Sequence, residues 1–279
     1  MVRILVILLF SVSVCYGQAN RFSGFGYRST CPVEALKFID SSGITDATEK
    51  LAICTLVKQL KDSLVWDSLI AIYPFVGGTS STCKWNLKDP RDRDSSYRLT
   101  FFGGVTFNGV GMLGNSVNGY ANTFFTPTYA SYPFFTIGIY LASNINELGA
   151  QMGTINGSNN GYSFFIRYAN IFYSQTGEQI ASTTVANTDS RGFYVATRTS
   201  DTRGVSWRDG SLFMTHISTS GSYGTQYPIL IGCRNNASTP LYFNTNRTGF
   251  ALIGSVGLSD AKLRALNTIF QTFKTATGK

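Results

Sequence analysis

The chain has 279 residues, of which 43% are hydrophobic, 14% aromatic and only 14% charged, and its formal net charge is +8 at pH 7. This length permits one large β domain with a small appendage. Basic residues are dispersed along the chain without a cluster, so the positive charge does not indicate a nucleic-acid-binding protein.

The first 19 residues have the pattern of a secretory signal peptide. Arg3 supplies the positive start, residues 4–14 form an apolar run, and residues 17–19 form a small-residue exit. The apolar run is shorter than the roughly 20 residues that a membrane span requires. We therefore expect residues 1–19 to be a leader and the mature protein to be extracellular, with a retained hydrophobic anchor as the alternative.

Residues 20–75 are expected to hold an irregular segment followed by one amphipathic helix. Asp46 and Glu49 have the spacing of a capping box at its start. Apolar residues then recur at helical spacing, namely Ile53, Leu56, Val57, Leu60 and Leu64. This pattern indicates a helix that packs on a β domain.

Residues 76–279 are expected to form that β domain and a final helix. Short β-branched and aromatic runs alternate with turn-forming clusters such as "NGSNNG" and "RNNASTP" between residues 96 and 256. This organisation predicts a mainly β fold, a two-sheet antiparallel jelly-roll sandwich. A C-terminal helix should begin at Ser259 and end near Gly278, with its apolar stripe packed on the sandwich.

The stretch "GVSWRDGSLFMTH" (204–216) predicts a β-hairpin. Asp209 and Gly210 suit a type I′ turn, in which both residues need φ > 0. The apolar face of the hairpin would hold Val205, Trp207, Leu212, Met214 and His216. The outer, mostly polar face would hold Ser206, Arg208, Ser211 and Phe213. We expect His216, the only histidine of the chain, to be a packed residue and not a catalytic base.

Four cysteines follow the leader, Cys31, Cys54, Cys83 and Cys233. An even number in an exported protein permits disulfides in any of three pairings. Buried free thiols are the alternative, which the position of Cys54 near an apolar helix face favours for that residue. The spacing matches no zinc site.

No catalytic site is evident. A glycosidase needs two carboxylates roughly 5–10 Å apart, and the acidic residues of the β region are scattered: Glu147, Glu178, Asp189, Asp201 and Asp209. Asp92 and Asp94 lie in "DPRDRD", which indicates a salt-bridged loop, with a calcium site as the alternative. We expect a non-enzymatic protein with no cofactor other than, at most, calcium.

A glycan-binding surface is the function that the composition favours. Aromatic rings stack on the apolar faces of sugars, and amides bond the hydroxyls. The candidate residues are Asn118, Tyr120, Asn122, Tyr162, Tyr223 and Tyr227. Ordinary roles in turns and at sheet edges are the alternative for each of them.

Residues 72–127, beginning "IYPFVGGTSSTCKW", and residues 231–279, beginning "IGCRNNASTP", resemble a sequence type of tailed-phage virion proteins. The hairpin "SWRDGSLF" is similar to that of laminin-G-like, concanavalin A-like lectin domains. The likeness extends from about residue 45 to the end. It implies a concanavalin A-like sandwich in a virion surface protein of the tail-fibre, spike or receptor-binding type. The signal-like leader departs from the usual phage pattern.

Three functions follow from these observations. The first is a virion surface protein that contacts other virion proteins, forms a homo-oligomer and attaches to a host cell-surface glycan. The second, which the leader favours, is a secreted bacterial carbohydrate-binding protein. The third is a glycoside hydrolase or lyase, which requires two of the scattered carboxylates to converge.

Overall fold

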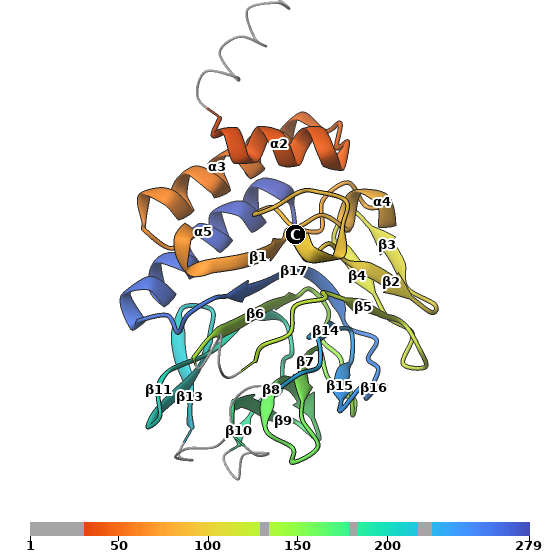
Figure 1. The fold of residues 1–279 in the computed structure, drawn as a ribbon, viewed down its shortest axis with the longest axis vertical. Helices are drawn as coiled ribbons and strands as arrows, with labels where there is room; N and C mark the ends of the chain where they lie inside the picture. Colours follow the sequence, from red (N-terminus) through yellow and green to blue (C-terminus); the bar gives the residue numbers. More distant parts are fainter. Residues whose placement is uncertain (1–30, 129–133, 179–183, 217–224) are drawn as a thin grey trace, which may run out of the picture.

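Two β-sheets stack face to face, and helices cover the outer face of one of them (Figure 1). The computed structural model describes residues 31–128, 134–178, 184–216 and 225–279. The predicted leader and the glycan candidate Tyr223 lie outside these residues. The predicted mainly β, two-sheet sandwich with a C-terminal helix is confirmed.

The helices are α2 (Val33–Ser42), α3 (Ala47–Asp62), the short α4 (Ser80–Cys83) and α5 (Asp260–Thr277), with 3-10 turns at Trp66–Ser68 and Asp94–Ser96. Helix α3 begins as predicted, because Asp46 Oδ1 accepts the Glu49 amide at 2.8 Å. The Glu49 carboxylate does not complete the capping box and instead accepts the Gly77 amide at 3.1 Å. Helix α5 is capped by Ser259, as expected.

Helix α2 occupies part of the segment that the sequence suggested was irregular. Its buried face consists of Ala35, Phe38, Ile39 and Ser42. This face is short, and the residue at the N-cap is Pro32, whose side chain forms no capping hydrogen bond. The usual start signal of a helix is therefore missing from the sequence.

A disulfide joins Cys31, just before α2, to Cys54 in α3. Cys83 and Cys233 are separate buried thiols. Burial raises the pKa of the Cys83 thiol to about 11. The structure thus combines one disulfide with two buried thiols, and it places Cys54 in the bonded pair although its position on α3 favoured a free thiol.

The eight-stranded sheet has the order β13-β12-β11-β6-β17-β4-β3, and β1 pairs with β17. Its strands are β1 (Leu69–Tyr73), β3 (Thr106–Asn108), β4 (Gly111–Leu113), β6 (Thr136–Leu141), β11 (Gly192–Ser200), β12 (Arg203–Arg208), β13 (Ser211–His216) and β17 (Arg247–Gly254). Because β1 belongs to this sheet, the sandwich begins before residue 76, where the sequence suggested a boundary.

The nine-stranded sheet has the order β10-β9-β8-β7-β14-β5-β2, with β15 beside β7 and β16 beside β15. Its strands are β2 (Thr100–Phe102), β5 (Tyr120–Asn122), β7 (Met152–Ile155), β8 (Gly161–Tyr168), β9 (Ile171–Thr176), β10 (Val185–Ala186), β14 (Leu230–Ile231), β15 (Arg234–Asn236) and β16 (Thr239–Leu241). Strands β7 and β15 form a parallel pair within this otherwise antiparallel arrangement. In Figure 1, α2, α3 and α5 lie on the far side of the eight-stranded sheet. The outer face of the nine-stranded sheet therefore points away from these helices.

Alternation of side chains along the strands separates two hydrophobic cores. Between the sheets, Ile139 and Tyr194 pack with Phe164 and Phe172. On the other side of the eight-stranded sheet, the α5 residue Phe270 packs among apolar residues of the sheet and of α3. In the described part of the chain, no helix is long and apolar enough to span a membrane.

The tip of the β12–β13 hairpin has the predicted turn. Asp209 and Gly210 have φ of 47° and 81°, the left-handed values that a type I′ turn needs. Trp207 pairs with Leu212, as predicted. The turn therefore fixes the start of the hairpin as the sequence indicated.

The predicted register is wrong beyond Leu212, because a β-bulge adds Phe213 to β13. Met214 consequently pairs with Ser206 and lies, like His216, in the interior. Leu212 is 56% exposed instead of buried. The predicted polar outer face is also wrong for Ser206, which is fully buried.

Candidate ligand-binding site

A cavity of about 260 Å³ is formed by side chains on the outer face of the nine-stranded sheet. Alternation turns Phe165 of β8 and Tyr173 of β9 to this face, whereas Phe164 and Phe172 fill the core. The cavity is lined by Leu148, Ser163, Phe165, Tyr168, Tyr173, Ser174, Gln175, Arg234 and Tyr242. We call this set of residues the aromatic pocket.

The rim of the aromatic pocket is apolar and accessible. Leu148, Tyr168 and Tyr242 are 51%, 41% and 37% exposed. Deeper in the pocket, the Ser163 hydroxyl donates to Gln175 Oε1 at 2.7 Å, so these two polar groups satisfy each other. The pocket therefore offers ring surfaces to a ligand.

Arg234 forms an inner wall of the aromatic pocket and is only 3% exposed. Its guanidinium carbon lies 5.1 Å from the ring centre of Phe165 and 4.9 Å from that of Tyr242. Its Nε has no hydrogen-bond partner among the described residues. Burial lowers the pKa of this guanidinium, but arginine stays protonated in proteins. The pocket thus combines aromatic walls with a buried positive charge.

Glu147 forms hydrogen bonds that link the Leu148 side of the rim to the Tyr242 side. Its carboxylate accepts the Thr245 amide at 2.7 Å, the Thr245 hydroxyl at 2.8 Å and the Asn246 side-chain amide at 2.9 Å. Glu147 directly precedes Leu148, and Thr245 follows Tyr242 by three residues. These contacts join the two chain segments that carry the rim residues Leu148 and Tyr242.

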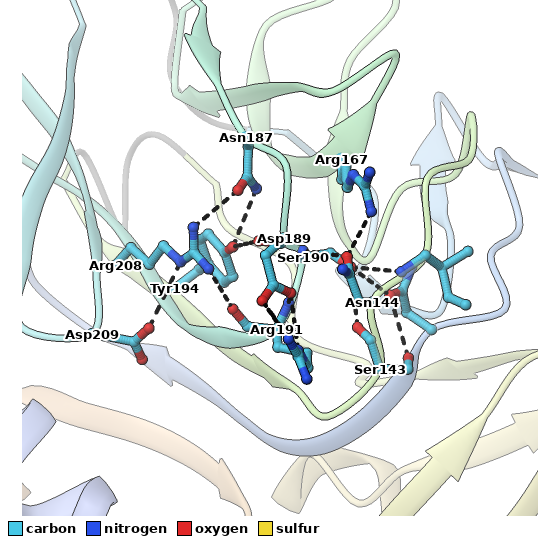
Figure 2. Close-up of polar contacts among 12 residues, drawn as sticks. Ser143, Asn144, Arg167, Asn187, Asp189, Ser190, Arg191, Tyr194, Arg208 and Asp209 are labelled. Atoms are coloured by element: carbon cyan, nitrogen blue, oxygen red, sulfur yellow. Dashed lines mark hydrogen bonds and ion pairs between the residues drawn. The ribbon is translucent and has the colours of Figure 1, made fainter.

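A second set of polar contacts supports the turn that carries Tyr168 (Figure 2). Asn144 Oδ1 accepts hydrogen bonds from Arg167 Nη1 at 2.7 Å and from the Ser190 amide at 2.9 Å. Arg167 Nη2 also donates to Asn170 Oδ1 at 2.7 Å. Because Tyr168 directly follows Arg167, the loops around Asn144 and Ser190 fix this side of the pocket.

Three of the predicted glycan residues lie together on β5 and the turn before it, outside the aromatic pocket. Asn118 Oδ1 and Asn122 Oδ1 each accept a backbone amide, at 3.1 and 2.8 Å. Tyr120 stacks on Phe102 with their ring centres 4.9 Å apart. The two asparagines therefore perform turn chemistry, and only the Tyr120–Phe102 pair presents a ring surface.

The other two described candidates do not join them. Tyr162 is fully buried between the sheets, with its ring centre 3.6 Å from that of Phe135. The prediction that Tyr162 contacts a glycan is thus wrong, because β8 has apolar residues on both faces and its sequence does not show which face is internal. Tyr227 is half-buried and lies outside the pocket lining.

Asp189 and Asp209, both labelled in Figure 2, line one polar hollow near the hairpin tip. Asp189 pairs with Arg191 at 2.7 Å, and the hydrogen bonds from Arg191 lower the pKa of Asp189 to about 2. Asp209 Oδ1 accepts the Phe193 amide at 2.9 Å. The general acid of a glycosidase needs a raised pKa, whereas Asp189 has a depressed one.

The two aspartates proposed for calcium are engaged in ion pairs. Asp92 lies 2.6 Å from Lys84 Nζ and 3.3 Å from Arg98 Nε, and Asp94 also pairs with Arg98. Among the described residues, no group of three or more His, Cys, Asp or Glu side chains gathers to hold a metal. The loop is salt-bridged, and it offers no assembled calcium ligand set.

His216 belongs to a buried polar cluster between the sheets. Its Nδ1 bonds Glu178 Oε1, and its Nε2 lies 3.1 Å from Ser206 Oγ and 3.3 Å from Ser174 Oγ. Arg198 Nη2 donates to the other Glu178 oxygen at 2.8 Å. Burial raises the pKa of Glu178, but hydrogen bonds and charges from His216 and Arg198 together outweigh burial and lower this pKa to about 2.

The order carboxylate, imidazole, hydroxyl in this cluster is that of a catalytic triad. The hydroxyls of Ser174 and Ser206, however, lie in the interior 2.7 Å from each other, and Ser174 turns its side chain to the same side of β9 as the core residue Phe172, away from the pocket. His216 is packed in the interior, as predicted, and we interpret the cluster as a structural network. The sequence gives no sign of it, because Glu178, Arg198 and His216 are distant from one another along the chain.

No protein-family model matches the chain, and no curated protein sequence does either. Solved structures share its fold. A mutant of Trypanosoma rangeli sialidase displaying trans-sialidase activity aligns with a TM-score of 0.53 and 14% identity, over 79% of this chain and 39% of the sialidase. The receptor-binding domain of botulinum neurotoxin C/D mosaic serotype aligns with a TM-score of 0.50 and 11% identity, over 73% of this chain and 51% of that domain. The chain thus spans about half or less of these proteins, and the likeness shows the sandwich fold.

Proposed function

We propose that this chain is a non-enzymatic glycan-binding protein and that the aromatic pocket holds the sugar. The observation that supports this most directly is the set of accessible rings, Tyr168, Tyr173 and Tyr242, around one cavity on a sheet face that points away from the helices. Sugar rings present apolar C–H faces that stack on such side chains. The volume of about 260 Å³ lies just below the usual range for small-molecule sites, roughly 300–1,000 Å³, which suits a ligand no larger than one sugar ring.

The setting that we propose is the surface of a virion, where the protein contacts other virion proteins and a host cell-surface glycan as part of a homo-oligomer. The support is the sequence resemblance to tailed-phage virion proteins. A secreted bacterial carbohydrate-binding protein is the second candidate, which the signal-like pattern of residues 1–19 favours. Mass spectrometry of purified virions and of culture medium separates the two settings.

A glycan array with residues 20–279, run with and without EDTA, tests the proposed function. We expect binding that EDTA does not change, because the described residues that line the pocket include no His, Cys, Asp or Glu side chain. Substituting Tyr168→Ala or Tyr242→Ala should weaken binding about tenfold, since each variant removes one stacking surface. Tyr120→Ala is the matched control, because it removes a ring outside the pocket.

The outcomes distinguish two surfaces on the same domain. Loss of binding in the Tyr168 and Tyr242 variants, with Tyr120→Ala unaffected, supports the aromatic pocket. The reverse pattern assigns binding to the Tyr120–Phe102 surface instead. If the protein binds none of the glycans on the array, the proposed function is wrong.

A further inference from the structure

Arg234 is a buried positive charge without a counter-ion in the protein. All 15 acidic residues of the chain lie within the described residues. Their ion pairs involve other cations and leave Arg234 unpaired. Buried charges are normally paired, because desolvating an isolated one is costly. A negative charge from outside the chain would therefore complete this site.

The neighbours of Arg234 orient its guanidinium but leave donors uncommitted. The Phe165 and Tyr242 rings lie close enough for cation–π contact, which consumes no N–H group. Gln175 Oε1, which also lines the pocket, receives the Ser163 hydroxyl, and among the described residues Gln175 forms no hydrogen bond with Arg234. A guanidinium with free donors matches a planar carboxylate, which can accept two parallel hydrogen bonds.

The backbone at Tyr242 adopts a conformation that is uncommon for a bulky residue. Its φ of 61° lies in the left-handed region, which a bulky residue adopts only when its surroundings impose it. This conformation accompanies the placement of the ring against Arg234. The exposed ring and the buried cation thus form adjacent parts of one surface.

We propose that the ligand of the aromatic pocket is a carboxylate-bearing sugar, with its carboxylate on Arg234 and the apolar face of its ring against Tyr242. This inference rests on the proposed glycan-binding function and adds the charge of the ligand. Uronic acids and nonulosonic acids share the required chemistry, since both carry a carboxylate on the sugar ring.

Calorimetric titration of the mature chain with two matched pairs of probes tests this proposal. The first pair is methyl β-glucuronide and methyl β-glucoside, which differ in the carboxylate. The second is the α-methyl glycoside of N-acetylneuraminic acid and its methyl ester. We expect at least one acid to bind about tenfold or more tightly than its neutral counterpart, and the pair that shows the preference identifies the sugar.

The variant Arg234→Met should abolish the preference for the acid while binding of the neutral sugar persists, because the aromatic walls remain. Arg234→Lys should restore part of the preference, since it keeps the charge but lacks the planar fork. Arg203→Met is the charge-matched control: Arg203 is exposed and pairs with Asp260, so its loss should leave the preference intact.

Equal binding of acidic and neutral sugars, or a preference that survives Arg234→Met, overturns the assignment of an acidic ligand but leaves the proposed function standing. A sulfated monosaccharide that binds more tightly than both carboxylates also overturns it. Absence of binding to every sugar, neutral or acidic, counts against the proposed function itself.

Discussion

The guanidinium carbon of Arg234 lies 4.9 Å from the ring centre of Tyr242, so a buried cation and an exposed ring form one contact. Both residues line the pocket on the outer face of the nine-stranded sheet, and neither belongs to the core between the sheets. A binding site commonly costs stability, because groups kept for a ligand are poorly satisfied without it. This relationship leads to a test that needs no ligand.

Substituting Arg234→Met should leave the fold intact and raise the free energy of unfolding by about 1 kcal/mol. The methionine would keep apolar contact with Phe165 and Tyr242 and would remove an unpaired buried charge. Urea denaturation measures the change. Arg167→Met is the control, because Arg167 makes hydrogen bonds to Asn144 and Asn170 and its loss should lower stability. A clear destabilisation by Arg234→Met would instead indicate a structural role.

Substituting Glu178→Gln should lower the free energy of unfolding by about 3–5 kcal/mol. The change leaves Arg198 and His216 buried without their carboxylate partner. Asp189→Asn is the matched control: its ion pair with Arg191 is largely exposed, so the loss should stay below about 1 kcal/mol. Equal effects of the two variants would contradict the importance assigned to the buried cluster.

The same carboxylate should make stability depend on pH. The pKa of Glu178 is about 2 in the folded protein and near 4.5 ordinarily. A depressed pKa contributes stability that is complete above pH 4.5 and is lost as pH falls towards 2. Melting temperatures measured between pH 2 and 6 should therefore fall less steeply in Glu178→Gln than in the wild type. Parallel curves would show that Glu178 does not titrate as described.

Breaking the Cys31–Cys54 disulfide should cost about 3 kcal/mol, because the bond closes a loop with a sequence separation of 23. The double variant Cys31→Ser/Cys54→Ser removes it, and thermal denaturation measures the loss. Cys83→Ala and Cys233→Ala test buried thiols that take no part in the bond. Peptide mapping without reductant should recover the Cys31 and Cys54 peptides linked, and any other pairing would contradict the structure.

Substituting Gly210→Val should lower the free energy of unfolding by about 1–3 kcal/mol, because a β-branched residue resists φ > 0. The φ of Gly210 is 81°, and a Cβ there would lie 2.6 Å from Asn267 Nδ2. Gly157→Val is the control, since no atom lies within 4 Å of a Cβ at that position. An unchanged melting temperature for Gly210→Val would mean that the turn is not as described.

The sequence predicted those parts of the fold that depend on local signals. The Asp209-Gly210 turn and the capped starts of α3 and α5 are set by residues near one another in the chain. The bulge at Phe213 cannot be predicted, because an extra residue in a strand leaves no mark in the pattern of apolar residues. Helix α2 has no capping side chain at its start, so the sequence does not predict it.

The candidate site was less predictable, because it forms from distant parts of the chain. Phe165 comes from β8 and Arg234 from β15, which the sheet topology brings together through the shared neighbour β7. Residue type predicts Tyr120 and Tyr162 as glycan contacts, but it does not show whether a ring faces solvent or the core. An unpaired arginine among aromatic residues is visible only once side-chain contacts are known.

Helix α5 packs across the eight-stranded sheet and covers the outer face of that sheet. Under the proposed function, each copy holds its sugar on the opposite broad face, and contact with one monosaccharide is expected to dissociate quickly. Stable attachment would then require multivalency. Several copies would bind one glycan-coated surface together, and their combined avidity would exceed the affinity of each site.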